Sequence, residues 1–491
     1  MATNPLFTEL PPRPEAQPEP PSEGPTASSG APRSRPRILE ADRRSARLVS
    51  TQLDALLPAD HAARAVWAYV LRQDLSALYE AIRAREGMAG RPAIDPQILL
   101  ALWLYATLEA VGSARELDRL CRSQIAFQWI CGGVSVNYHT LADFRTQHVD
   151  LLERLLVAGV ATLMAGGLVD LCSVAQDGMR VRASAGADTF RRRETLEQCL
   201  GLAREQVEKL RSELDDAPGA SNRRSAAAQQ RAAAEREARL TAALEGLAKI
   251  EARQPVEAPQ EPEPSAPSSP HPPEAPPAAP PADPDTNTSA AKAEKKAPKP
   301  PRASPTDPEA RRMKMADGGF RPAYNVQFAT DVASQIIVGV SLDNEGTDAG
   351  QLEPMVAQLK QDYDRTPQNV LVDGGYVQLD AIERLEADGI KVVAPVPKPK
   401  NPKRDRYQPL PRDPPGVAAW RTRMGTEEAK KLYIQRGATA ECVNALARQR
   451  GLHQFPVRGQ TKAYAVALWL ALAHNLRRAL TLHPHLALGA S

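Results

Sequence analysis

Hydrophobic positions recur at helical spacing between residues 45 and 165. In residues 96–111 the apolar run begins directly after Asp95-Pro96, a capping residue followed by proline at the first helical position. Residues 113–130 open with Ser113, and Glu116 follows at capping-box spacing. This part of the chain is therefore predicted to be a domain of several short helices.

Shorter apolar runs with strand character follow. One run ends at Asp177-Gly178, and another, residues 370–372, ends at Asp373-Gly374. Apolar residues alternate at 324–328, and a second run at 335–340 follows a short turn, which predicts a β-hairpin. Helical patterns at 348–363 and 378–389 enclose the 370–372 strand and precede a last strand at 390–396. This order predicts an α/β fold with a mixed sheet, antiparallel at first and parallel afterwards.

An insert interrupts the sheet pattern. Between residues 190 and 215 apolar positions alternate steps of three and four, and a second helical pattern runs from 223 to 252, which predicts a helical hairpin. Proline-rich composition predicts a disordered linker. The predicted organisation is a disordered tail (1–44), a helical domain (45–165), a sheet domain in two pieces (166–189 and 316–480), a hairpin (190–252), a linker (253–315) and a C-terminal tail (481–491).

Composition narrows the class of protein. The 491 residues carry a net charge of only +3, so any nucleic-acid contact must come from local basic patches. The five cysteines show no zinc-ligand spacing, and no apolar stretch approaches the ~20 residues of a membrane span. The N-terminus lacks the apolar region of a secretory signal. We therefore expect an intracellular protein without a membrane anchor.

The strand order is that of a ribonuclease-H-like fold, in which the first and fourth strands are neighbours. Asp177 and Asp373 would then lie together and repel each other unless a cation sits between them. Hard divalent ions with oxygen ligands suit such a pair, and a third acid would complete a two-metal site for phosphodiester chemistry.

The candidate third acid is Glu441. It lies on a predicted helix with Arg436 before it and Arg448 seven residues after it, so that Glu441 and Arg448 share a face. Glu427 and Glu428 are rivals, because exposed helices commonly carry acids.

Several stretches together resemble the DDE transposases of bacterial insertion sequences. They are QDGMRVRASAG, TDPEARRMK, DGGFRPAYNVQFATD, NVLVDGGY, and AECVNALARQRGLHQFPVRGQTKAYAVALWLALAHNLRR, with residues 91–145 similar to the N-terminal domain of these enzymes. The resemblance implies that Asp177 and Asp373 are catalytic aspartates and metal ligands. It also places the catalytic glutamate in a motif that maps onto Tyr433, Arg436, Glu441 and Arg448. The chain departs from the commonest motif, because the Arg-to-Glu spacing is one residue longer and Arg448 replaces lysine.

The resemblance further implies a function. Mg²⁺, with Mn²⁺ as a substitute, would support DNA cleavage at the element's ends and strand transfer into target DNA. Double-stranded DNA is the expected partner, both as terminal inverted repeats and as target. A homodimer or larger assembly would pair the two ends of the element. The protein would be cytoplasmic in a bacterium and associated with the nucleoid. Two alternatives are a non-catalytic repressor derived from a transposase and a structure-specific nuclease of the same fold.

The candidate DNA contacts are Tyr433, Arg436 and Arg448 of that motif and basic residues around the other motifs. Arg180 and Arg182 follow the first aspartate, and Arg458 and Lys462 precede the last helix, where phosphate binding and an ordinary capped loop are equally good interpretations. Asn325 and Gln327 are expected to serve the sheet, and His474 the core. The helical domain would read DNA with arginines on its polar helix faces, namely Arg115, Arg119, Arg122 and Arg145.

Overall fold

A computed structural model describes residues 52–84, 92–216, 223–253, 300–399, 401 and 403–483. The predicted tail 1–44, most of the predicted linker (residues 254–299) and most of the predicted C-terminal tail 481–491 (residues 484–491) lie outside the described residues. Residues 481 and 482 were assigned to the C-terminal tail, yet they belong to the last helix. Residues 300–315 were assigned to the linker by composition, yet they include a strand, so this end of the segment belongs to the sheet.

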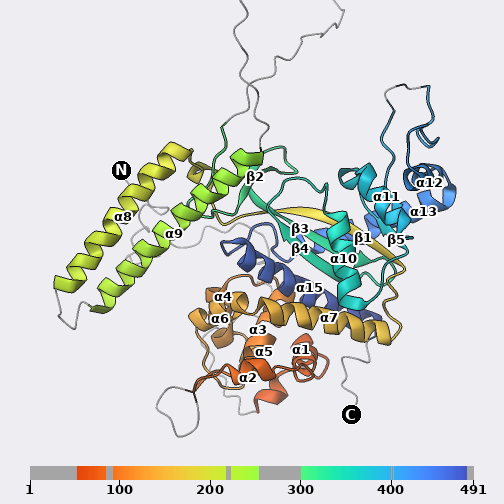
Figure 1. Ribbon diagram of the computed structural model, residues 1–491. Coiled ribbons are helices and arrows are strands. Elements are labelled where there is room, and N and C mark those ends of the chain that lie inside the picture. The colour runs from red at the N-terminus through yellow and green to blue at the C-terminus, as the bar shows by residue number, and fades with distance from the viewer. Residues whose placement is uncertain are drawn as a thin grey trace, which may run out of the picture. The chain divides into compact units, whose positions relative to one another are not determined.

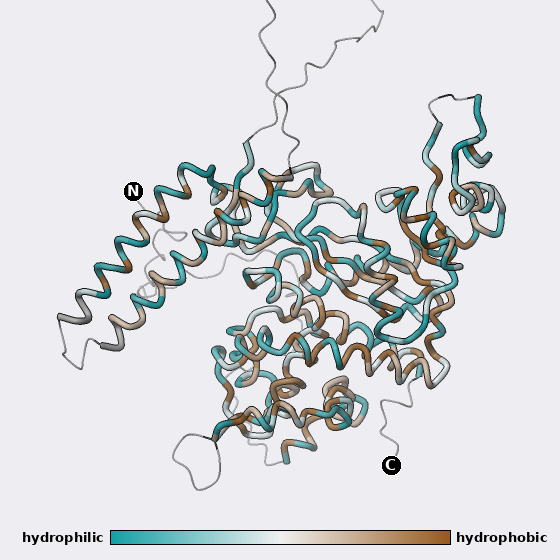
Figure 2. Tube along the Cα trace, viewed as in Figure 1, coloured by the Kyte–Doolittle hydropathy of each residue, from teal (hydrophilic) through white to brown (hydrophobic). Residues whose placement is uncertain are grey.

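The first part of the chain is helical, as predicted (Figure 1). Asp95 caps its central helix by accepting a hydrogen bond from the Gln97 amide at 2.8 Å, and Pro96 occupies the first turn. This helix is apolar on all sides because its neighbours surround it, and Figure 2 shows hydrophobic residues concentrated there. The elements are η1 (Leu53–Leu56), α1 (Ala62–Val70), α2 (Ser76–Glu80), α3 (Pro96–Leu108), α4 (Ala114–Ser123), α5 (Ile125–Cys131), α6 (Tyr138–Gln147) and α7 (Val149–Ala165).

One of the four arginines expected on polar helix faces is in fact buried. Arg145 lies over the Trp103 ring, 4.6 Å from its centroid, and donates to the Gly112 carbonyl oxygen. Arg119 and Arg122 pair with acids one helical turn earlier on α4, and Arg115 lies over the Tyr138 ring. The prediction for Arg145 was wrong because helical spacing does not reveal that α15 (Gln460–Leu482) packs against α6.

The sheet is mixed, and its hydrogen bonds run in the order β2–β3–β1–β5–β6. Strands β2 and β4 both pair with β3, on the side of β3 that faces away from β1. Strands β3 and β4 form the β-hairpin that the sequence predicted. Strand β1 pairs antiparallel with β3 and parallel with β5, which pairs parallel with β6. The strands are β1 (Ser173–Arg182), β2 (Arg311–Lys314), β3 (Phe320–Asp331), β4 (Ile337–Asp343), β5 (Asn369–Leu371) and β6 (Lys391–Val393).

Helices connect the later strands and close the C-terminal part. They are α10 (Leu352–Tyr363), η3 (Gly374–Tyr376), α11 (Leu379–Ala387), α12 (Pro415–Met424), α13 (Glu427–Arg436), the π-helical turn η4 (Gly437–Glu441) and α14 (Cys442–Gln449). The helix α15 packs on β4 and also on α3 and α7, so the helical region and the sheet share one apolar core.

The hairpin consists of α8 (Arg193–Asp216) and α9 (Arg223–Arg253). The apolar seam between α8 and α9 is buried at the base of the hairpin, the end at which α8 begins and α9 ends. Farther along the hairpin, Arg204 on α8 forms an ion pair with Glu237 on α9. Leu196, Leu200 and Ala203 are buried as the heptad spacing predicts, against Leu240, Ala243 and Leu247. None of the described helices combines the length and apolar character of a membrane span.

His474 on α15 is a core histidine, as expected. Only 4% of it is exposed, and its Nε2 lies 2.9 Å from the Gln335 carbonyl oxygen. Burial lowers the pKa of His474 to about 4, and the charges of Arg450 and Arg478 act in the same direction. The unfolded chain therefore binds this proton more tightly than the folded protein does.

We expect the free energy of unfolding to fall as pH decreases from about 6.5 to about 4, by roughly 3 kcal/mol for this group. His474→Gln removes the titrating group and should show a smaller decrease over the same range. Urea unfolding at pH 7 and pH 4.5 measures both proteins. Equal decreases in the two proteins would show that His474 titrates normally in the folded state.

Candidate active site

Asp177 lies within β1 rather than at its end. The sequence pattern predicted a strand ending at Asp177-Gly178, but β1 continues to Arg182 because β3 pairs with it from Val174 to Arg182. What ends here is the pairing with β5, which reaches only Ala175. Asp177 therefore lies just beyond the parallel ladder, with its side chain 18% exposed.

Asp373 lies just after β5, separated from Leu371 by Val372, so that an aspartate follows this strand as predicted. Its Oδ1 accepts a hydrogen bond from the Gly375 amide at 2.7 Å, which caps the short turn η3. A side chain at Gly375 would place its Cβ 2.9 Å from that oxygen, so the second glycine permits the tight turn. Since β1 and β5 are parallel neighbours, the two aspartates come from the same edge of the sheet.

The pKa of Asp177 is raised by its surroundings. Burial raises the pKa of Asp177 to about 6, and the nearby charges of Asp373 and Asp348 also raise it. Arg436 opposes this shift, with Nη1 3.5 Å from Asp177 Oδ1. The buried Asn444 donates from Nδ2 to Asp177 Oδ2 at 2.9 Å. Asp177 is thus held by one cation and one amide.

Arg436 also contacts Glu441, since its Nη2 donates to Glu441 Oε1 at 2.8 Å. In an α-helix, residues five apart are rotated by about 140° and cannot meet in this way. The π-helical turn Gly437–Glu441 absorbs one extra residue. The unusual Arg-to-Glu spacing is therefore accommodated locally, and Arg436 bridges Asp177 and Glu441.

Behind Asp177, on the other face of the sheet, lies a buried polar network. Asp348 Oδ1 accepts hydrogen bonds from Asn325 Nδ2 at 2.7 Å and Gln327 Nε2 at 2.8 Å. Gln327 in turn accepts from the Tyr376 hydroxyl, so the network reaches the turn after Asp373. A Cβ at Gly178 would lie 2.1 Å from Asp348 Oδ1, so the glycine after Asp177 leaves the space that Asp348 fills.

Asp348 and Asn444 were not identified from the sequence. Asn444 is three residues after Glu441, a spacing that places both on one helix face. Asp348 follows a strand and precedes α10, which is the pattern already noticed at Asp373. Both signals are weak in isolation because many helices and loops carry such residues.

The candidate DNA contacts differ in their surroundings. Arg180 donates to the carbonyl oxygens of Lys314 and Gly346, at 3.1 and 2.9 Å, and so fastens β1 to its neighbours. Tyr433 is partly buried beneath the Arg436 guanidinium, 5.9 Å from the ring centroid. Arg458 is exposed and donates to the Ser184 carbonyl oxygen at 3.3 Å. The remaining candidates, Arg182, Arg448 and Lys462, are exposed.

The donor set suits a hard divalent ion, because the acids offer oxygen atoms and already repel one another. In the described part of the chain, however, no three His, Cys, Asp or Glu side chains are gathered closely enough to share a metal ion. Glu441 is 61% exposed and turned toward Arg436, whose guanidinium forms ion pairs with both Glu441 and Asp177.

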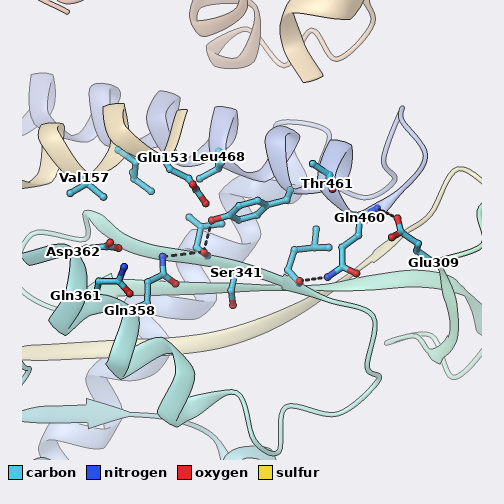
Figure 3. A pocket seen from close by; sticks show the side chains of 14 residues that line it. Glu153, Val157, Glu309, Ser341, Gln358, Gln361, Asp362, Gln460, Thr461 and Leu468 are labelled. Atoms are coloured by element: carbon cyan, nitrogen blue, oxygen red, sulfur yellow. Dashed lines mark hydrogen bonds between the residues drawn. The ribbon is translucent and has the colours of Figure 1, made fainter. Parts of the chain in front are cut away.

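A cavity of about 610 Å³ lies away from these acids, between α7, β4, α10 and α15 (Figure 3). Its polar side chains largely bind the chain itself. Gln460 donates to the Leu342 carbonyl oxygen at 2.8 Å, and the Gln460 amide donates to Glu309 at 2.6 Å. Tyr464 donates to the Val340 carbonyl oxygen at 3.2 Å. These bonds join α15 to the sheet, so the cavity is part of that packing.

Two family models match the chain. Residues 51–147 match "Transposase domain (DUF772)", and residues 291–476 match "Transposase DDE domain". Neither a curated protein nor a solved structure matches. The first match covers the helical region up to α6, and the second covers β2 to most of α15, leaving β1 and the hairpin between them. With both transposase domains in order around one sheet, the chain belongs to the DDE transposases of insertion sequences.

Proposed function

We propose that this transposase cleaves DNA at the ends of its insertion sequence and joins them to target DNA, with Asp177, Asp373 and Glu441 as its catalytic acids. One observation carries the proposal. The β1–β5 pairing brings Asp177 and Asp373 to one sheet edge, where Arg436 links Asp177 to Glu441.

The sheet supports a ribonuclease-H-like assignment. Its strands run β4–β3–β1–β5–β6, with the first three antiparallel and the last two parallel to β1. The edge strand β2 is an addition to this arrangement. In this order Asp177 lies within the first core strand, β1, just beyond its pairing with the fourth, β5, and Asp373 lies after β5.

Mg²⁺, or Mn²⁺ in its place, would be held by Asp177, Asp373 and Glu441. When bound, such ions activate water and stabilise the charge that develops on a reacting phosphodiester. Without such an ion, the guanidinium of Arg436 balances the negative charges of Asp177 and Glu441. Releasing Glu441 from Arg436 costs little, because an ion pair with a partner this exposed is weak.

The surrounding residues keep the acids in place. Asn444 orients one oxygen of Asp177, and the Gly375 amide orients one oxygen of Asp373. Water attack on the phosphodiester breaks the strand and leaves a 3′-hydroxyl, which attacks a target phosphodiester and expels a new 3′-oxygen. No covalent enzyme intermediate is needed. The exposed Arg182, Arg448, Arg458 and Lys462 would contact phosphates.

The helical region would read the terminal inverted repeats, with Arg115 and Arg119 on its exposed surface. Pairing two ends requires at least two protomers, and the α8–α9 hairpin offers a surface for their assembly.

Asp373→Asn keeps the size and the Gly375 contact but removes the charge. We expect it to abolish Mg²⁺-dependent cleavage of a labelled duplex that carries the element's end, while binding of that duplex changes by less than about threefold. Gel analysis of cleavage and anisotropy of binding measure the two effects. Asp380→Asn, an exposed acid on α11, is the matched control and should cleave normally. Normal cleavage by Asp373→Asn would refute the assignment, and wild-type binding without cleavage in Mg²⁺ or Mn²⁺ would favour a repressor.

The raised pKa of Asp177 gives a second test. Between pH about 4 and about 6 the folded protein binds this proton more tightly than the unfolded chain, so deprotonation costs at most about 3 kcal/mol of stability. In EDTA, the free energy of unfolding of the wild type should fall, relative to Asp177→Asn, as pH rises through that range. Urea unfolding at pH 4.5 and 7.5 measures it.

At pH 7.5, adding Mg²⁺ should raise the melting temperature of the wild type and leave that of Asp177→Asn unchanged, because a ligand stabilises only the state that binds it. An equal rise in both proteins would place the bound cation elsewhere.

A further inference from the structure

A groove lined by arginines lies where the base of the hairpin meets the edge of the sheet. Its volume is about 910 Å³, and its lining includes Arg192, Arg302, Arg311 and Arg312 together with Ile250 and Phe320. We call it the arginine groove. None of the described residues that line it is acidic. It belongs jointly to the insert, through the residues flanking α8 and on α9, and to β2 and β3.

The backbone forces like charges together in this groove. Arg191 and Ala303 form an antiparallel bridge, with amide-to-carbonyl distances of 2.9 and 3.1 Å. Arg192 and Arg302 are the next residues on either side of that bridge. Like charges facing each other across an antiparallel pair are destabilising. An anion between them would remove this cost.

Three of the groove's arginines have no acidic partner in the described part of the chain. Among described residues, Arg192, Arg302 and Arg312 form no side-chain ion pair, and the adjacent acid Glu251 is bonded to Arg193. Arg311 donates to the carbonyl oxygens of Pro308 and Ala310, at 2.8 and 3.2 Å, and these hydrogen bonds hold its guanidinium at the groove.

An aromatic ring lies among these cations. Phe320, at the start of β3, is 56% exposed. The other phenylalanines in the described part of the chain are all buried, namely Phe127, Phe144, Phe190, Phe328 and Phe455. Exposed aromatic rings beside arginines are the combination that binds a nucleic-acid strand, with phosphates on the cations and a base on the ring.

We infer that the arginine groove binds a strand of the DNA substrate outside the acidic site, with Phe320 stacking on an unpaired base. Phe328, the partner of Asp177, lies eight positions after Phe320 along β3, a span of about 26 Å at 3.3 Å per residue. That span equals roughly eight nucleotides at 3.4 Å each. One DNA segment can therefore reach both places.

The inference takes its ligand, DNA, from the proposed function, so it is tested by binding in EDTA, where cleavage plays no part. The full chain carrying R192E, R302E and R312E is compared with wild type by anisotropy, using a labelled 40-base-pair duplex of the element's end at several salt concentrations. We expect at least tenfold weaker binding and a salt slope smaller by about 2 to 3, since each lost phosphate contact contributes ~0.9.

The matched control reverses Arg211, Arg231 and Arg236, exposed residues of the same hairpin, which changes net charge equally. They lie at least about 20 Å along their helices from the groove. The control should bind as the wild type does, and circular dichroism checks that both variants are folded. Equal weakening of both variants, or wild-type binding by the groove variant, would overturn the inference.

Phe320→Ala tests the aromatic contact separately. We expect binding of a duplex with a single-stranded extension to weaken at least fivefold, and binding of the blunt duplex to change less than twofold, because only unpaired bases can stack on the ring. Equal effects on both probes would remove Phe320 from the proposal. Loss of binding in the groove variant with normal cleavage by Asp373→Asn would leave the groove standing and refute only the catalytic assignment.

Discussion

The parallel ladder between β1 and β5 is the interaction on which the site depends. It spans only three residue pairs, yet it joins segments separated by the whole hairpin and linker. Buried Val370 and Leu371 hold β5 in the core, and Asn369 donates to the Ser173 hydroxyl at 3.1 Å. Because side chains alternate along a strand, a slip of one residue would turn Asp177 or its partners to the opposite face. The register of the β1–β5 pairing therefore determines the geometry of the candidate active site.

That geometry carries an electrostatic cost, which the protein offsets with local contacts. Two partly buried aspartates repel each other, and the raised pKa of Asp177 records both its burial and this repulsion. Arg436 and Asn444 reduce the cost from the α13–α14 segment. The π-helical turn is the feature that lets Arg436 reach Asp177 and Glu441 together. Electrostatic compensation and helix irregularity are thus linked in one segment.

A network of polar side chains on the other face of the sheet supports the two aspartates. Gly178 has no side chain, Asp348 fills the space above it, and Asn325 and Gln327 hold Asp348 with hydrogen bonds. These two residues were expected only to serve the sheet, and they do so while also fixing a fourth acid near the first two. These hydrogen bonds tie Asp348 to β3, whereas the Oδ1 of Asn325 has no hydrogen-bond partner among the described residues.

Local signals in the sequence were enough for the helices, the β-hairpin, the heptad seam and the aspartate after β5. Helix caps such as Asp95 and the alternation at 324–328 depend on neighbours a few residues away, which a linear pattern records. The same signals could not reveal that β1 continues past Asp177, that Arg145 is buried, or that residues 311–314 form a strand.

Those features depend on partners far away along the chain. The length of β1 is decided by β3, the burial of Arg145 by the packing of α15, and the strand β2 by an edge of β3 that accepts its hydrogen bonds. The identities of the acids were thus written in the sequence, whereas their separation, their compensating cation and the arginine groove arise only when distant segments pack. The physical reason is that side-chain type is a local property, while burial, register and charge proximity are set by whichever segments the folded chain brings into contact.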